Sequence, residues 1–297
     1  MRNPSTLARL AGAIRGRLDK KNAPDEKNAP AYGLNELTNV GRWDDPEWLR
    51  VHLELETYSV DKHCFTTDKD LAMRKGWEWT QCLYGLHRLG KITPNAAALG
   101  VGAGHEPVLF YLADRISRVV GTDIYGNDFW SALGGREADA TILQDARRFC
   151  PRSFDYERLT LMNMDGTKLD FDAATFDFVW SLSSIEHFGG HDASAKSVRE
   201  MARVVKPGGL VVIATEFLLS GDDHPEYFAR ENFEKYILGA SDALSPTEPM
   251  SYSEPASVYM NDAIKVQTDD VHRRRHHIVL DDGARKWTSV IVFLRKN

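Results

Sequence analysis

Short apolar segments alternate with amphipathic ones through the middle of the chain. The apolar segments have the length and composition of buried strands and cover residues 96–101, 118–124, 159–165, 176–184 and 209–217. Periodic apolar positions between them predict helices at residues 106–115, 137–149 and 194–205. Strands that alternate with helices predict an α/β fold with a doubly wound, mostly parallel sheet.

Both ends of the chain depart from this rhythm. Residues 1–41 combine a basic amphipathic helix with a polar linker that is rich in Asn, Pro and Gly, and residues 42–92 read as a helical cap region. Near the other end, residues 241–262 are polar and predict a long loop. Residues 276–280 and 288–296 predict an antiparallel hairpin that closes a main domain over residues 93–297.

Charge and cysteine content exclude some classes of protein. The formal charge of −6 argues against a nucleic-acid binder. The three cysteines contain no CxxC pair, which favours a reducing, cytoplasmic setting over a structural zinc site. No apolar run approaches the roughly 20 residues that span a bilayer. The basic helix at residues 1–21 fits peripheral contact with an anionic membrane, packing on its own domain, or a homodimer contact.

Three features after successive strands predict a cofactor that contains adenosine. Alternating glycines follow the first strand, where a bare backbone permits close approach to a ligand; they are Gly100, Gly102 and Gly104. Asp123 ends the second strand about 20 positions later, where a carboxylate accepts both ribose hydroxyls. After the third strand, Asp165 is placed to accept from an adenine amino group while Met164 lies against the ring. Nicotinamide enzymes share the first two devices.

The order of the motifs carries a family resemblance. GVGAGHE, TDIY, NMDG, FDFVWSLSSIEHF and VVKPGGLVVI together resemble class I S-adenosylmethionine-dependent methyltransferases, in the small-molecule, methyltransferase type 11-like branch. The resemblance covers about residues 95–217 and implies a Rossmann-like, seven-stranded sheet with a reversed last strand, here with an N-terminal helical extension. It implies S-adenosylmethionine as the cofactor. It assigns to the cofactor site Gly100, Gly102, Gly104, Glu106, Asp123, Ile124, Met164, Asp165 and Ser181.

The segment after the fourth strand contains the candidate catalytic groups Glu186, His187 and His191. Methyl transfer requires an aligned acceptor, and a hydroxyl acceptor also requires removal of its proton. Histidine and carboxylate side chains at the carboxyl end of a central strand suit that role. In the alternatives, the three residues hold a divalent metal, which is the less favoured reading, or they only shape the loop.

The helix before the first strand supplies candidates for acceptor binding. Trp77, Glu78, Gln81 and Tyr84 combine aromatic and polar groups that suit a sugar-like ring, although the aromatic residues equally suit packing onto the sheet. The basic run His272–His277 predicts either a phosphate site or a solvated face.

These observations predict O-methylation of a small-molecule or glycosidic acceptor. N-methylation, cofactor binding without turnover, and a nicotinamide-dependent oxidoreductase are the alternatives.

Overall fold

The structure is a computed structural model that describes residues 32–126, 138–266 and 275–297. Residue contacts divide the chain into two units, residues 1–32 and residues 33–297. The second unit contains the sheet and the helices that cover it. The basic helix predicted for residues 1–21 and part of the basic run, residues 272–274, lie outside the described residues.

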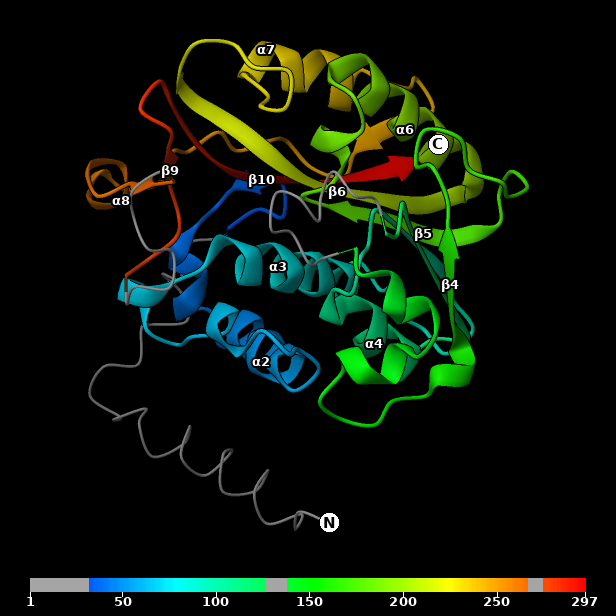
Figure 1. Cartoon of the computed structure of the whole chain (residues 1–297). Helices are drawn as coiled ribbons and strands as arrows, with labels where there is room; N and C mark the ends of the chain where they lie inside the picture. The colour runs from blue at the N-terminus through cyan, green and yellow to red at the C-terminus, as the bar shows by residue number, and fades with distance from the viewer. Residues whose placement is uncertain (1–31, 127–137, 267–274) are drawn as a thin grey trace. The chain divides into compact units, whose positions relative to one another are not determined.

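The core of the domain is a sheet of parallel strands (Figure 1). In spatial order these are β4 (Leu159–Asn163), β3 (Arg118–Asp123), β2 (Ala97–Val101), β5 (Phe176–Leu182) and β6 (Val205–Gly221). The long strand β10 (Arg285–Lys296) runs antiparallel to β6 along the next position. The predicted α/β fold with a reversed last strand is therefore confirmed. Because the parallel strands share one direction, their carboxyl ends meet at one edge of the sheet.

The outer edge of β10 is covered by three short strands from distant parts of the sequence. They are β9 (Leu280–Asp281), β1 (Glu36–Leu37) and β7 (Leu244–Pro246), and each pairs antiparallel with β10. A fourth short strand, β8 (Ile264–Lys265), pairs with β9. The described residues thus form ten strands where seven are predicted. Strands of two or three residues are too short to produce a hydrophobic pattern, so the sequence does not reveal them.

The predicted linker is wrong for residues 33–41, and the predicted loop at 241–262 is partly structured. Residues 33–41 belong to the domain, where Leu37 is buried in β1 and the Asn35 side chain accepts a hydrogen bond from the Phe293 backbone N–H at 2.7 Å. Residues 241–262 contain β7 and the short helix α8 (Ser257–Asn261). Both polar segments are held by β10, a contact that local composition does not show.

Helices cover both faces of the sheet (Figure 1). One face carries α2 (Pro46–Glu56), α3 (Arg74–Arg88) and α4 (Pro107–Ala113), and the other carries α6 (His191–Val204), α7 (Arg230–Phe233) and the π-helical turn η8 (Glu234–Leu238). Single-turn 3-10 helices lie at Val40–Asp44 (η1), Lys62–Cys64 (η2), Lys69–Leu71 (η3), Tyr156–Arg158 (η6) and Ile185–His187 (η7).

The helix predicted at residues 137–149 is replaced over its described part by two 3-10 helices. These are η4 (Ala140–Leu143) and η5 (Ala146–Phe149). Asp145 separates them, because its backbone is extended and its side chain accepts the Arg147 N–H as an N-cap. Asp favours such caps over helix interiors, so it interrupts a pattern that is otherwise helical.

Candidate active site

The turn between β2 and α4 depends on two glycines with left-handed backbone. Gly102 has φ +66° and Gly104 has φ +47°. A Cβ added to Gly102 would lie 2.5 Å from the Cβ of Ser184, so the turn has room for glycine alone there. Gly100 differs, because it lies inside β2, and a Cβ there would lie 2.7 Å from the Trp180 indole. Gly100 is therefore part of the strand, and its missing side chain makes room for Trp180.

The end of β3 is tied directly to this turn. The Asp123 carboxylate accepts the Gly104 N–H at 2.8 Å and the Ile124 N–H at 2.7 Å. The Ile124 side chain is 45% exposed, which leaves an apolar surface next to the carboxylate. The Met164 N–H donates to the Asp123 carbonyl at 2.9 Å, so the ends of β3 and β4 are joined. Asp165 follows with an exposed side chain that accepts the Thr167 N–H.

The family resemblance assigns both Glu106 and Ser181 to the cofactor site, but the two residues lie on different sides of the sheet. The Glu106 carboxyl is buried beneath the turn and accepts the indole N–H of Trp180. Burial raises the pKa of Glu106 to about 8. Ser181 is adjacent to Trp180 in β5, so its fully buried side chain points to the opposite face of the sheet. Ser181 is therefore separated from the glycine turn.

At the carboxyl end of β5, Glu186 is the buried member of the three predicted catalytic residues. One carboxyl oxygen accepts the Thr215 hydroxyl at 2.9 Å, and the other has no hydrogen-bond partner among the described residues. Burial raises the pKa of Glu186 to about 7. Two residues earlier, the Ser184 hydroxyl donates to the Gly102 carbonyl at 2.6 Å, which joins this loop to the glycine turn.

The two histidines are engaged elsewhere. His187 is 27% exposed in its side chain, and its Nδ1 lies 3.4 Å from a carboxylate oxygen of Glu226. The His191 Nε2 lies 3.1 Å from the Tyr227 carbonyl oxygen, and its ring packs at 4.6 Å from that of Phe228. Across residues 32–126, 138–266 and 275–297, no group of three or more His, Cys, Asp or Glu side chains is arranged to hold a metal ion. His191 therefore positions the start of α6.

A comparison with known protein families identifies the region that contains the glycine turn and strands β2 to β5. Residues 99–213 match the family model described as a methyltransferase domain. The chain carries a class I S-adenosylmethionine-dependent methyltransferase domain. The predicted family, enzyme class and cofactor are thus confirmed.

Solved methyltransferase structures resemble the chain weakly. Phosphoethanolamine N-methyltransferase 2 of Haemonchus contortus, in complex with S-adenosyl-L-methionine, is 16% identical, with 73% of this chain and 52% of that chain covered and a TM-score of 0.46. 1,6-Didemethyltoxoflavin-N1-methyltransferase of Burkholderia thailandensis is 16% identical, with 71% of this chain and 74% of that chain covered and a TM-score of 0.42. A SAM-dependent methyltransferase from Aquifex aeolicus is 14% identical, with 70% of this chain and 87% of that chain covered and a TM-score of 0.39. These likenesses carry no information on the acceptor.

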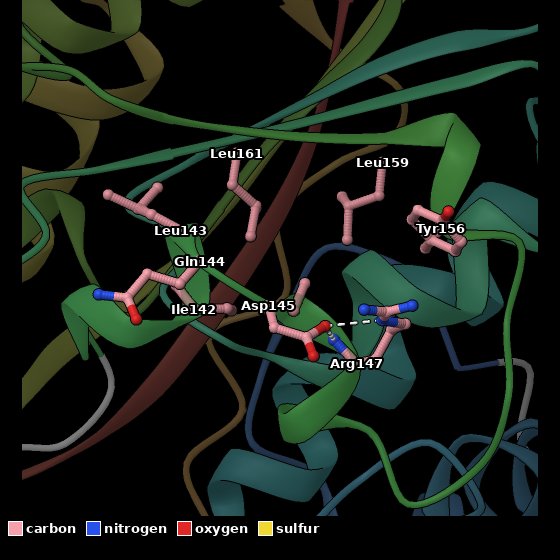
Figure 2. A pocket seen from close by; sticks show the side chains of 9 residues that line it. Ile142, Leu143, Gln144, Asp145, Arg147, Tyr156, Leu159 and Leu161 are labelled. Carbon is pink, nitrogen blue, oxygen red and sulfur yellow. Dashed lines mark hydrogen bonds and ion pairs between the residues drawn. The ribbon is translucent and has the colours of Figure 1, made fainter.

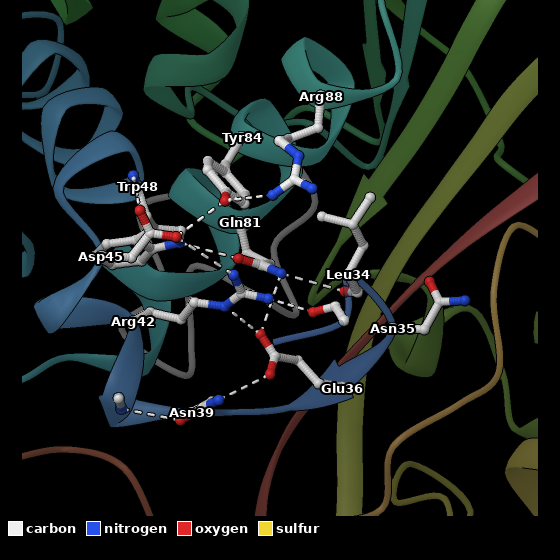
Figure 3. Close-up of polar contacts among 12 residues, drawn as sticks. Leu34, Asn35, Glu36, Asn39, Arg42, Asp45, Trp48, Gln81, Tyr84 and Arg88 are labelled. Atoms are coloured by element: carbon white, nitrogen blue, oxygen red, sulfur yellow. Dashed lines mark hydrogen bonds and ion pairs between the residues drawn. The ribbon is translucent and has the colours of Figure 1, made fainter. Parts of the chain in front are cut away.

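Two of the predicted acceptor residues of the methyltransferase belong to a network of polar contacts with residues of β1 and α2 (Figure 3). The Gln81 side chain accepts the Trp48 indole N–H at 2.9 Å and donates to Glu36 at 3.2 Å. The Tyr84 hydroxyl donates to Asp45 at 2.9 Å. These bonds join α3 to α2 and β1. Trp77 is fully buried in the core. Gln81, Tyr84 and Trp77 therefore have packing and hydrogen-bonding roles, and their acceptor role stays a prediction.

Glu78 differs from these residues because it faces the carboxyl end of β5 and the amino-terminal half of β10. Its carboxylate accepts the Ser183 hydroxyl at 2.6 Å and that of Ser289, and Lys75 Nζ lies 3.5 Å away. The neighbouring cations Lys75 and Arg74 hold the pKa of Glu78 below its usual value in spite of burial. Ser183 has φ +50°, a strained conformation for serine that commonly accompanies functional sites.

Sequence reasoning missed Arg74, Lys75 and Glu216. Arg74 donates to Glu216 at 2.7 Å, and Lys75 donates to the Leu182 carbonyl at 3.2 Å. Glu216 lies in the apolar run "VVIATEF" of β6. A single acidic residue within a buried strand was the one sequence feature that could have marked it as a site residue. Burial raises the pKa of Glu216 to about 7.

The described part of the predicted basic run has structural partners. Arg275 donates to the carboxylate and the carbonyl of Asp262. His277 is enclosed, and burial lowers the pKa of its imidazole to about 3, so it is neutral at pH 7. Its backbone bonds with Ala72 and Arg74 hold the start of α3. The phosphate site predicted at residues 272–277 therefore has no support from residues 275–277.

A separate cavity of about 200 Å³ lies beside the edge strand β4 (Figure 2). Its apolar lining includes Leu143, Leu159 and Leu161, and Asp145 and Arg147 form an ion pair of 2.7 Å at its rim. None of the predicted site residues lines it. The cavity therefore lies outside the candidate active site.

Proposed function

We propose that the methyltransferase transfers a methyl group to a hydroxyl oxygen of a small-molecule acceptor, with Glu186 as the general base. The observation that carries the proposal is the position of the Glu186 carboxyl. It is buried next to the loop that touches the glycine turn, one oxygen is held by Thr215, and the other has no partner among the described side chains. A carboxyl group fixed in this way is suited to accept a proton from a hydroxyl.

The cofactor site of this proposal lies across the ends of β2, β3 and β4. Gly102 has left-handed backbone and no room for a side chain, so the turn presents bare backbone, which suits a ligand that approaches it closely. Asp123 would hold the ribose, and the exposed Ile124 and the half-buried Met164 would flank the adenine, with Asp165 near its amino group. The buried Glu106 carboxyl would face the amino-acid end of the cofactor. When bound, S-adenosylmethionine supplies a methyl group on a positively charged sulfur.

The chain's own residues then align the acceptor and remove its proton. Glu186 accepts the proton at the oxygen that Thr215 does not hold. A pKa of about 7 lets Glu186 exchange a proton near neutral pH, where a base with an ordinary carboxyl pKa is weaker. His187, half-buried and paired with Glu226, is the second candidate base, because it follows Glu186 directly and is partly open to solvent.

Calorimetric titration of S-adenosylhomocysteine tests the cofactor site. We expect micromolar binding to the wild type, at least tenfold weaker binding to Asp123→Ala, and no binding of NADH. Asp170→Ala removes an exposed carboxylate and serves as the matched control with unchanged affinity. Binding of NADH in place of S-adenosylhomocysteine, or equal affinity in both aspartate variants, would contradict the assignment.

A screen with radiolabelled S-adenosylmethionine tests the base. Once an acceptor is found, the rate should fall below about pH 7 in the wild type, because Glu186 becomes protonated. Glu186→Gln should lose at least a hundredfold in kcat. A label on nitrogen would replace O-methylation by N-methylation, and full activity of Glu186→Gln would transfer the role to His187.

Membrane contact through residues 1–21 remains a prediction, as does a homodimer. None of the helices in the described ranges combines the length and apolar character that crossing a membrane requires. Deletion of residues 1–21 should release the protein from anionic vesicles in a flotation assay. Equal flotation of both forms, or no flotation of the full chain, would end the membrane proposal.

A further inference from the structure

A network of buried charged side chains lies beside Glu186, at the carboxyl ends of β5 and β6. Arg74, in the first turn of α3, donates to Glu216 at 2.7 Å and lies 3.2 Å from Glu78. Glu78 also accepts hydrogen bonds from Ser183, directly after β5, and from Ser289 of β10. Four separate elements therefore hold these groups next to the proposed base.

Three polar atoms of this network are buried without a hydrogen-bond partner within the described residues. They are the second carboxyl oxygen of Glu216, the second carboxyl oxygen of Glu186 and Nε of Arg74. The Glu216 residue is 6% exposed and Glu186 is fully buried. Native structures leave few buried polar atoms without partners, because each one costs stability. Three such atoms within one network are therefore compatible with a ligand that supplies the missing bonds.

The hydrogen-bonding capacity of these three atoms limits which functional groups the ligand can carry. Two of them are carboxyl oxygens, which accept hydrogen bonds when ionised, and one is a guanidinium N–H, which donates. A protonated amine only donates and leaves Nε of Arg74 without a partner. A phosphate only accepts, and it is repelled by the carboxylates of Glu78, Glu186 and Glu216. Hydroxyl groups both donate and accept, so a ligand with several hydroxyls satisfies all three atoms.

We propose that Glu216 and Arg74 bind a polyhydroxylated acceptor of the sugar-ring type and present one of its hydroxyls to Glu186. The inference rests on the proposed function, since Glu186 is the base of that reaction. The ring of the neighbouring Tyr227 is stacked between those of Trp287 and His224, with centroids 4.5 Å and 4.4 Å away, so both of its faces are covered. The polar atoms of Glu216, Arg74 and Glu186 therefore carry the recognition.

The test uses the full-length protein loaded with S-adenosylhomocysteine and saturation-transfer NMR. The probes are the methyl glycosides of mannose, glucose and rhamnose, with ethanolamine and spermidine as amines and glucose 6-phosphate as an anion. We expect at least one neutral glycoside to bind. Glu216→Gln should weaken its binding tenfold or more through the lost charge-assisted bonds, while S-adenosylhomocysteine affinity stays unchanged.

A matched control and a second variant keep the result interpretable. Glu231→Gln removes an exposed carboxylate on α7 and should change nothing. Arg74→Lys keeps the positive charge but removes Nε, so it should weaken glycoside binding as Glu216→Gln does, and thermal unfolding checks that the variant stays folded. Binding of amines alone, of the phosphate alone, or of no probe to the loaded protein would overturn the proposal. Loss of S-adenosylhomocysteine binding in the wild type would instead overturn the proposed methyl transfer itself.

Discussion

Replacement of Glu186 by glutamine should make the protein more stable at alkaline pH while it abolishes activity. Burial raises the pKa of this carboxyl from 4.5 to about 7. One pKa unit corresponds to about 1.4 kcal/mol, so ionisation of Glu186 costs the folded state about 3 kcal/mol. Glutamine has the shape of the protonated acid and carries no charge, which removes this cost.

The direction of the pH dependence follows from the raised pKa. Because the folded protein binds this proton more tightly than the unfolded chain, the associated stability is complete below about pH 4.5 and is lost as the pH rises through about 7. Glu186→Gln should therefore match the wild type near pH 4.5. At about pH 8 its free energy of unfolding should exceed that of the wild type by up to about 3 kcal/mol, or roughly 6 °C in Tm.

Urea unfolding at several pH values measures the effect, and a second carboxylate serves as a control of opposite sign. Glu200 pairs with Arg203 at 2.8 Å, and hydrogen bonding to Arg203 lowers the Glu200 pKa. Glu200→Gln should thus lower stability near pH 7, and this effect should fade as the pH falls through the acid range. A difference between Glu186→Gln and the wild type that does not vary with pH would refute the reasoning, since it would show that Glu186 does not bind its proton more tightly in the folded state.

Three further substitutions test, in turn, the glycine turn of the cofactor site, the polar network around Gln81 and the packing of the core. Gly102→Ala forces a side chain into a left-handed turn without room for it, so S-adenosylhomocysteine affinity should fall at least tenfold in calorimetry; unchanged affinity would contradict the turn assignment. Gln81→Leu leaves buried polar partners unpaired and should cost about 2–3 kcal/mol in urea unfolding with cofactor affinity retained, whereas the reverse pattern would return Gln81 to the ligand site. Gly85→Ala would overlap the ring of Phe293 and should cost about 1–3 kcal/mol, and addition of Phe293→Leu should recover part of that loss; strictly additive losses would refute the contact.

Local sequence patterns determined the strands, the turn and the cofactor class of this methyltransferase. A parallel strand that is buried on both faces appears in the sequence as a continuous apolar run of five to nine residues. Strands β2 to β6 can therefore be predicted from the sequence. Gly102 and Gly104 are also local, because the turn that needs them is only a few residues long. Asp123 follows from the same logic, since it directly ends a strand that is itself apparent from the sequence.

Tertiary structure alone decided which polar side chains share a site. Glu78 and Gln81 lie one turn apart on α3, yet Glu78 faces Ser183 and Ser289, whereas Gln81 bonds to α2 and β1. The helix pattern places both on a similar side and cannot show that different elements lie along its length. Glu216 meets Arg74 only because the sheet brings β6 beneath the start of α3. Contacts of this kind depend on residues far apart in the chain, so no local pattern predicts them.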